Sequence, residues 1–410
     1  MKLKKYLKRI LLRSQKYTKT DMVYVARSGF WYAIGKIGLV ILSFLTMAAF
    51  GWWLPKQTFG SYQYILSVTS ILAIFTLPGM GDPLARAISR GKEGMLRASS
   101  LASLKWSFIG IGGCLAVAVW YLYHQNTFLG ISFLFASFLF PLTRIFHYFS
   151  SFWQGKKRFD IRSKYTILSN ALEALVLVPV IFLTNNLIII IAAYFSSRTL
   201  FKGIFFKLTL DRTKNKEEDK ETIPFGKHLT VMQAVSLLGS QLDKIVLWHL
   251  LGAVPVAVYS FSKLPLSKLE GLIPISQLAL PKLSQKKTKK EKLFEKFLKL
   301  FLISVPLTIF LILSAPLVYR VLFPQYLESV PYFQVLALDT IFIPFLLLES
   351  SFLAEIKKKA LYIVRTTTPF LQVGLILILT PLFGIWGLVS AFLLTQALKN
   401  GLIFYFFKKS

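Results

Sequence analysis

The sequence has little of the residue types that build disulfide frameworks and metal sites. Cys114 is the only cysteine among 410 residues, so an internal disulfide or a cysteine-based metal site is excluded. The four histidines are scattered along the chain and suggest no ligand cluster. We therefore expect neither a bound metal nor any other cofactor.

Acidic residues are also scarce, with 18 Asp and Glu against 49 Lys and Arg and a net charge of +31. An excess of this size often indicates nucleic-acid binding. The positions of the basic residues explain it better, as described below, and we expect no nucleic-acid partner. A cleavable signal peptide is not visible either, because no small-residue cleavage site follows the first apolar run.

Apolar residues, in contrast, are abundant: the chain is 55% hydrophobic and 15% aromatic, with a mean hydropathy of +0.58. Runs of about 20 apolar residues, enough to cross a hydrocarbon core of about 30 Å, recur along its length. The sequence therefore predicts an all-α integral membrane protein with about twelve transmembrane helices. The predicted spans are 29–53, 62–82, 106–124, 128–152, 166–184, 187–207, 229–251, 256–280, 297–323, 332–354, 367–383 and 387–407.

The connections between these spans alternate in charge. One set is rich in Lys and Arg and includes 86–105, 156–164, 202–228 and 282–299, whereas the other set is short and contains only Lys56. Because basic loops resist translocation, the basic set and both termini are predicted to be cytoplasmic. This basic face should also attract anionic membrane lipids.

Short stretches of the chain recur at a nearly constant offset. The matched pairs are 54–68 with 251–265 at an offset of 197, 150–158 with 350–359 at 200, and 202–206 with 399–404 at about 198. Each match is weak, but the shared offset indicates a duplication. Halves with an even number of spans have the same orientation, so two parallel six-helix lobes should enclose a central cavity.

The duplication predicts the following organisation. A basic cytoplasmic tail (1–28) precedes an N-terminal six-helix lobe (29–207). A cytoplasmic linker (208–228) then leads to a C-terminal six-helix lobe (229–410).

Charged residues occur inside the predicted spans. The basic ones are Lys36, Arg144, Arg198, Lys244, Lys263, Lys268 and Arg320, and the acidic ones are Glu173, Asp243, Glu270, Asp339 and Glu349. A charge at the bilayer centre costs about a few kcal/mol, so it normally faces a partner or a wet cavity. Since basic residues outnumber acidic ones, the cavity should be net positive.

Two pairs of these charges flank short turns at matching distances. Glu173 and Arg198 lie on either side of the Asn185–Asn186 turn, and we predict a salt bridge between them. Such a bridge would suit either ion coupling or a purely structural role. Asp243 and Lys263 flank the next hairpin turn in the same way, and if they pair, Lys244 is left to face the cavity.

The remaining candidate site residues are charged residues for which the sequence suggests no oppositely charged partner. Arg144 has no acid in its own hairpin and is the best candidate for a free cavity cation. Lys36 is a second one, although it lies near the inner end of its helix and can alternatively extend to the membrane interface. Asp339 and Glu349 have no obvious partner by spacing, so they are candidates for coupling to H⁺ or Na⁺.

Several local patterns resemble the polysaccharide-synthesis (Wzx-type) flippases of the multidrug/oligosaccharidyl-lipid/polysaccharide exporter superfamily. They are ARSGFWYAIGKIG (26–38), FGSY (59–62), LPGMGDPLARAIS (77–89), SQLDKIVLWHLLGAVPVAVYSFSK (240–263), LALPKLSQ (278–285) and TPLFGIWGLVSA (380–391). The resemblance covers essentially the whole chain, but these patterns are apolar and degenerate. They identify the superfamily better than the substrate.

The resemblance implies a MATE-like fold and a flippase of the bacterial plasma membrane. Such a protein moves a polyprenyl-diphosphate-linked oligosaccharide to the outer leaflet by ion-coupled exchange, for O-antigen or capsule synthesis. Its pathway partners would be a polymerase and glycosyltransferases. The residues that match the family's cationic lumen are Arg144, Arg198, Lys244 and Lys263.

Three alternatives remain open from the sequence. A MATE-type multidrug antiporter would share the fold but would favour an acidic or aromatic cavity for its cations. A membrane-embedded polysaccharide polymerase normally needs a large outer loop, and every outer connection here is short, so an enzyme is not expected. A flippase for the peptidoglycan lipid precursor would resemble members that carry additional spans.

Overall fold

The computed structural model describes residues 22–270, 290–354 and 358–409, which fold into helices joined by turns. The elements are α2 (Met22–Trp53), α3 (Lys56–Leu72), η1 (Ala73–Thr76), η2 (Pro78–Met80), α4 (Gly81–Ser89), α5 (Met95–Tyr123), α6 (Thr127–Phe146), α7 (Tyr148–Gly155), α8 (Phe159–Leu183), α9 (Leu187–Leu210), α10 (Thr222–Leu251), α11 (Ala253–Glu270), α13 (Lys290–Leu322), η3 (Pro324–Ser329), α14 (Val330–Leu336), η4 (Ala337–Phe342), α15 (Phe345–Ala354) and α16 (Lys358–Lys409).

Helical segments cover the predicted spans as far as the described residues extend, and the end of the eighth span, 271–280, lies outside them. By length and composition, eight described helices can cross a membrane, and the bent pair Pro324–Phe342 and Phe345–Leu353 would make a ninth. Neither α10 nor the described part of α11 is among these helices, because charged residues such as Asp243 and Lys263 lower their hydropathy.

Helix α16 consists of two antiparallel limbs. Its backbone is non-helical at Gly384, where φ is +58° and ψ is −132°. The carboxylate of Glu349 contacts both Arg365, at 3.4 Å, and Lys399, at 3.7 Å. A straight helix would hold these two basic residues about 50 Å apart. The chain therefore reverses at Gly384, between the predicted spans 367–383 and 387–407.

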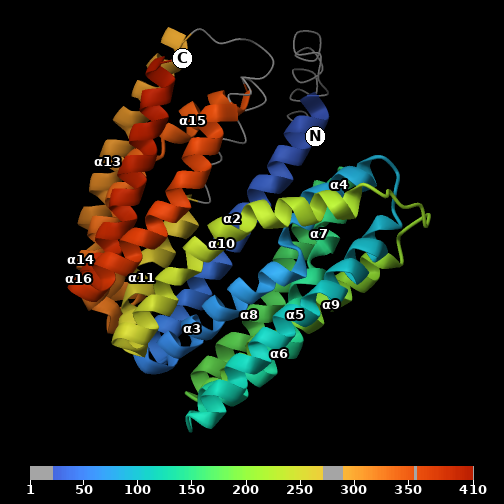
Figure 1. Cartoon of the computed structure of the whole chain (residues 1–410), viewed down its shortest axis with the longest axis horizontal. Helices are drawn as coiled ribbons and strands as arrows, with labels where there is room; N and C mark the ends of the chain where they lie inside the picture. Colours follow the sequence, from blue (N-terminus) through green and yellow to red (C-terminus); the bar gives the residue numbers. More distant parts are fainter. Residues whose placement is uncertain (1–21, 271–289, 355–357, 410) are drawn as a thin grey trace, which may run out of the picture.

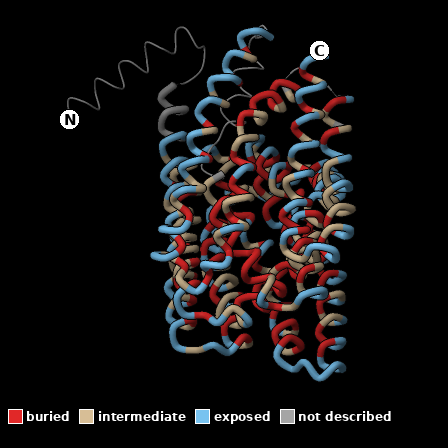
Figure 2. The backbone as a smooth tube through the Cα atoms, turned by 90° about the vertical axis from the view of Figure 1, so that its left-hand side faces the viewer, coloured by how far each residue is buried: buried red, intermediate tan, exposed pale blue. Residues whose placement is uncertain are grey.

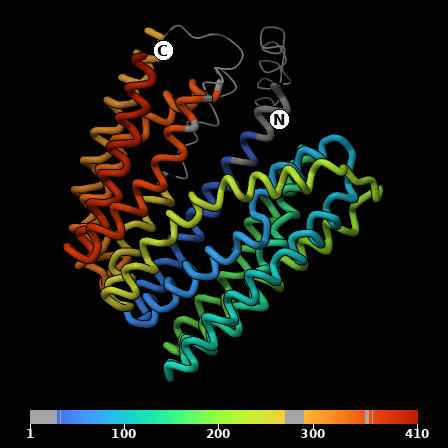
Figure 3. Tube along the Cα trace, viewed as in Figure 1, coloured from blue at the N-terminus to red at the C-terminus, as the bar shows by residue number. Residues whose placement is uncertain are grey.

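The helices form two groups that meet at one end (Figure 1). One group contains α2 to α9 and the other contains α13 to α16, while α10 and α11 lie between them (Figure 3). Buried residues gather inside the bundle and exposed ones outside (Figure 2). Many exposed side chains are large and apolar, including Phe108, Leu302 and Phe310, as expected for a lipid-facing surface. The exact lobe boundary at 208–228 stays a prediction.

The end of the molecule where the groups meet is formed by the two repeated stretches, which contact each other. A Cβ atom on Gly60 of α3 would lie 1.9 Å from the carbonyl oxygen of Ala253, so only glycine permits this approach. The ring of Phe59 lies 4.8 Å from Phe261, which stacks on Tyr326 at 3.6 Å. These aromatic contacts close the bundle at this end.

At the opposite end, the connection between α9 and α10 is attached to the connection between α4 and α5. Glu93 is 3% exposed, pairs with Lys156 and accepts a 2.6 Å hydrogen bond from the backbone N–H of Lys214. Asn215 accepts from the Glu93 N–H and donates to the carbonyl of Gly91. Burial favours a higher pKa for Glu93, but the hydrogen bonds from Lys156 and Lys214 outweigh it and hold the pKa below its ordinary value.

We predict that Gly384→Ala destabilises the reversal in α16 by about 1–3 kcal/mol, because its backbone conformation is strained for any residue with a Cβ atom. The measurement is the thermal unfolding midpoint of the protein in detergent. Gly401→Ala is the matched control, since a Cβ atom there meets nothing within 4 Å. Equal midpoints for the two variants would contradict the prediction.

We predict that Glu93→Gln loosens the α9–α10 connection and that trypsin then cleaves at Lys214, Lys216 or Lys220 several-fold faster at pH 7.5. The pKa of Glu93 is lowered in the folded protein, so the ionised carboxylate stabilises the folded state. This stabilisation is fully present above the ordinary glutamate pKa and is lost as the pH falls through the lowered pKa of the folded protein. Glu295→Gln, which removes an exposed ion pair with Lys299, should leave cleavage of this connection unchanged. Unchanged cleavage in Glu93→Gln would disprove the attachment.

Candidate functional site

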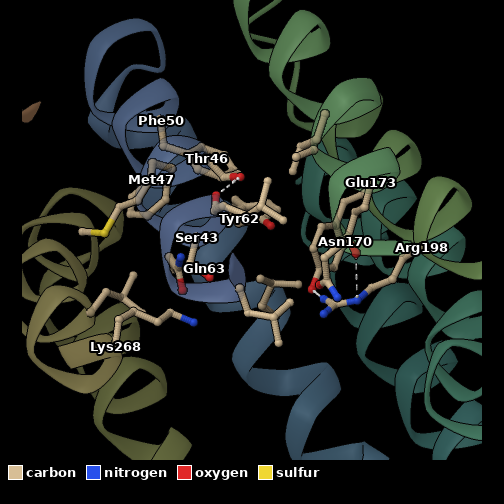
Figure 4. A pocket seen from close by; sticks show the side chains of 18 residues that line it. Ser43, Thr46, Met47, Phe50, Tyr62, Gln63, Asn170, Glu173, Arg198 and Lys268 are labelled. Atoms are coloured by element: carbon tan, nitrogen blue, oxygen red, sulfur yellow. Dashed lines mark hydrogen bonds and ion pairs between the residues drawn. The ribbon is translucent and has the colours of Figure 1, made fainter. Parts of the chain in front are cut away.

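Three adjoining cavities lie among α2, α3, α6, α8, α9 and α11, and α7 with the segment from η1 to α4 completes the lining of the main one. The main cavity has a volume of 580 Å³. The inner pocket, of 200 Å³, shares Ser43 and Lys268 with it and is also lined by Phe59 of the closed end. Figure 4 shows the side chains that line the inner pocket. The side pocket, of 120 Å³, lies among α3, α6 and α9. Arg198 lines all three, so the cavities meet at this residue.

The lining of the main cavity is strongly basic. Its charged lining residues are Lys36, Arg144, Arg162, Arg198, Lys202 and Lys268, and no Asp or Glu of the described residues lines it. Arg198 and Lys202 on α9 are one helical turn apart, so they face the same side of that helix, and Arg144 in the last turn of α6 lies three residues before His147, which follows the helix end. Helical periodicity therefore directs basic side chains from several helices into one volume.

Three of the five predicted cavity cations line the main cavity, namely Lys36, Arg144 and Arg198. The other two, Lys244 and Lys263, are not among the lining residues of the three cavities. The Nζ of Lys244 donates a 3.3 Å hydrogen bond to Gln63, and Lys263 pairs with Asp243. A substrate-binding role for Lys244 and Lys263 stays a prediction.

Both ion pairs predicted from matching depth are present. Glu173 Oε2 lies 3.4 Å from Arg198 Nε. Asp243 is 1% exposed, lies 2.6 Å from Lys263 Nζ and accepts a 2.9 Å hydrogen bond from the hydroxyl of Tyr259. A tight turn between antiparallel helices therefore predicted which charges meet.

Spacing indicated no obvious partner for Asp339 or Glu349, and the structure supplies partners for both. Asp339 accepts a 3.1 Å hydrogen bond from Gln396, and Glu349 contacts Arg365 and Lys399. Gln396 and Lys399 follow the reversal of α16 at Gly384, so spacing could not reveal them, whereas Arg365 precedes the reversal and is 16 positions from Glu349. Neither acid lines the three cavities, and their predicted coupling roles stay untested. The side chain of Glu270 lies outside the description.

Sequence reasoning missed Arg162, Lys202 and Lys268 as site residues. The sequence groups Arg162 and Lys202 with the basic connections, whereas the structure has them within α8 and α9 and at the main cavity. One signal for Lys202 was available, because it follows Arg198 by one helical turn. Lys268 lies in a predicted span, but its position in the sequence does not show that it lines a cavity formed mainly by helices α2 to α9.

We predict that Lys263→Gln lowers the free energy of unfolding by about 3 kcal/mol or more, because Asp243 is then a buried charge without its ammonium partner. The double variant Asp243→Asn with Lys263→Gln should recover most of this loss. Denaturant titration in mixed micelles measures both. Lys299→Gln, at an exposed ion pair, should cost less than about 1 kcal/mol. A double variant no more stable than the single one would refute the assigned pair.

The backbone arrangement is similar to those of solved transporters. An inward-facing multidrug resistance MATE family transporter of the MOP superfamily matches with a TM-score of 0.66 and 15% identity over 92% of this chain and 97% of its own. The lipid II flippase MurJ, in an inward closed conformation, matches with a TM-score of 0.70 and 13% identity over 92% and 87%.

A third structure is that of a MOP superfamily transporter from Pyrococcus furiosus, described as having a binding pocket of reverse polarity. It matches with a TM-score of 0.56 and 14% identity over 93% of this chain and 95% of its own. At these identities the likeness shows the fold alone, which is that of an all-α, multi-pass membrane transporter.

Comparison with curated protein sequences gives no match. The family model described as polysaccharide biosynthesis protein, however, matches residues 25–285, which is more than half of the chain. That range includes α2 from residue 25 onward, the elements from α3 to α11 and every described residue that lines the three cavities. The chain therefore belongs to the polysaccharide biosynthesis protein family, as the resemblance in its sequence indicated.

Proposed function

We propose that this protein is a flippase that moves a polyprenyl-diphosphate-linked oligosaccharide across the bacterial plasma membrane for surface polysaccharide synthesis. The observation that carries the proposal is the main cavity, whose described lining includes six basic residues and no acidic one. Such a lining suits an anionic headgroup, because Arg binds phosphate oxygens bidentately and Lys supplies a mobile positive charge. O-antigen and capsule repeat units are the glycan classes that we propose.

A protein route is needed because of the sugar part of the substrate. Each hydroxyl that enters hydrocarbon without a hydrogen-bond partner costs about a few kcal/mol, so a headgroup of several sugars crosses too slowly unaided. A cavity of 580 Å³ lies within the usual range of about 300–1,000 Å³ for ligand sites. We propose that it holds the diphosphate and part of the saccharide while the polyprenyl chain stays in lipid.

Alternating access by the two groups of helices completes the proposed mechanism. The aromatic contact of Phe59, Phe261 and Tyr326 closes one end, and the main cavity lies toward the end that bears the α9–α10 connection. With that end cytoplasmic, as the basic connections predict, the cavity would load from the cytoplasm. We propose H⁺ or Na⁺ as the coupling ion, cytoplasmic termini, and the polymerase and glycosyltransferases of the same pathway as partners.

The strongest alternative is a multidrug cation antiporter, which the fold likeness to a multidrug MATE family transporter supports. The lining argues against it, because an organic cation would enter a volume bordered by six basic groups. In the part of the chain that the structure describes, Glu173 is the only acid lining the three cavities, and it is already paired with Arg198. An enzyme is disfavoured because the structural relatives are transporters and a flippase.

We predict that Arg144→Gln and Lys202→Gln each reduce transport about tenfold or more, since a charge-assisted hydrogen bond contributes about 1.5–3 kcal/mol. The measurement is accumulation of lipid-linked repeat units at the cytoplasmic face of cells that carry the variant as their only copy. Arg320→Gln is the matched control, because Arg320 is exposed on α13 and lines none of the three cavities. Normal surface glycan in cells without the protein, in a strain lacking a second copy, would reject the proposed function.

A further inference from the structure

Arg198 differs from the other cavity cations in its position and its partners. It lies at the junction of the main cavity, the inner pocket and the side pocket. Its guanidinium donates to the hydroxyl of Tyr194 and lies 3.4 Å from the carboxylate of Glu173. An anion entering from any of the three cavities would therefore meet a guanidinium that already has a counter-ion.

The contact between Glu173 and Arg198 is an ion pair without a hydrogen bond. Neither Glu173 Oε2 nor Arg198 Nε has a hydrogen-bond partner, although both atoms are buried. Figure 4 shows the two side chains next to each other on one wall of the inner pocket. A contact at this distance without hydrogen-bond geometry is weaker than a bidentate pair. A ligand that supplies better-aligned oxygens can replace it.

The charges around Glu173 are otherwise basic. Lys202 lies on the same helix as Arg198, one turn away, and lines the side pocket with Arg144. Lys268 lies across the inner pocket on α11 (Figure 4), and Tyr62 lines the same pocket from α3. None of these groups is a carboxylate, so among the described residues that line the three cavities Glu173 is the carboxylate that limits how strongly they attract an anion.

We propose that Glu173 is a built-in competitor for Arg198, which the diphosphate of the substrate displaces on binding. This inference rests on the proposed function. Arg144, Arg198 and Lys202 together line the side pocket, whose volume of 120 Å³ suits a phosphate-sized group. Without a competitor, three cations would hold a diphosphate tightly and release it slowly, since affinity differences mostly change the dissociation rate. The carboxylate regains Arg198 as the diphosphate leaves and so promotes release.

A purely structural ion pair makes the opposite prediction. If Glu173 only joined α8 to α9, removing its charge would destabilise the protein and disorder the pocket, and anion binding would weaken. If it competes for Arg198, removing its charge frees the guanidinium and anion binding strengthens. The direction of the change in affinity therefore decides between the two roles.

The test is binding of inorganic diphosphate to the full-length protein in detergent, measured by titration calorimetry at constant ionic strength. Glu173→Gln should bind diphosphate about tenfold more tightly than the wild type, and the gain should disappear when Arg198→Gln is added. Glu349→Gln is the matched control. It neutralises an acid of similar side-chain exposure, 14% against 11%, that pairs with basic residues away from the cavities. Its affinity for diphosphate should equal that of the wild type.

Each outcome has one meaning. Unchanged or weaker binding by Glu173→Gln, with normal binding by the wild type, overturns the competitor role but leaves the proposed flippase intact. A gain that persists without Arg198 also overturns it. Absence of diphosphate binding in both proteins rejects the competitor role and the proposed function together. Should Glu173→Gln fail to fold, Glu173→Asp tests the competitor role instead. Its shorter side chain lies farther from Arg198, so the affinity for diphosphate should rise by less than the tenfold expected for Glu173→Gln.

Discussion

The structure depends on how positive charge is accommodated inside a membrane helix bundle. A basic side chain at the bilayer centre is costly unless it meets an acid or a solvent-accessible volume. The main cavity provides such a volume for Arg144, Arg198 and Lys202, which α6 and α9 direct toward the interior. The helices are thus rotated so that their basic residues face the cavity and avoid the cost of burial in the bilayer.

Charged residues are paired to different degrees in the two parts of the bundle. In the region of α10 to α16, Asp243 pairs with Lys263, and Glu349 contacts two basic residues. Between α2 and α9, by contrast, five basic residues line the main cavity, joined by Lys268 of α11, and no acid is among its described lining residues.

The two ends of the bundle also have separate roles. At one end the chain packs closely, with Gly60 against Ala253 and the rings of Phe261 and Tyr326 stacked on each other. At the other end, the α9–α10 connection is attached through Glu93 to the first group of helices. Motion between the groups would therefore break aromatic packing at the closed end while this attachment keeps the connection in place.

The sequence by itself determined the all-helical membrane fold, the positions of most spans and two ion pairs, because hydropathy and the equal depth of residues flanking a tight turn are local properties. Glu173–Arg198 and Asp243–Lys263 were predictable on this basis. Only the tertiary structure decided which cations share a cavity, since spacing does not show how each helix is rotated against its neighbours. For this reason Lys268 reaches the main cavity, whereas Lys244 contacts Gln63. The contact of Glu349 with Lys399 likewise depends on the reversal of α16 at Gly384, which brings together residues that are distant in the chain.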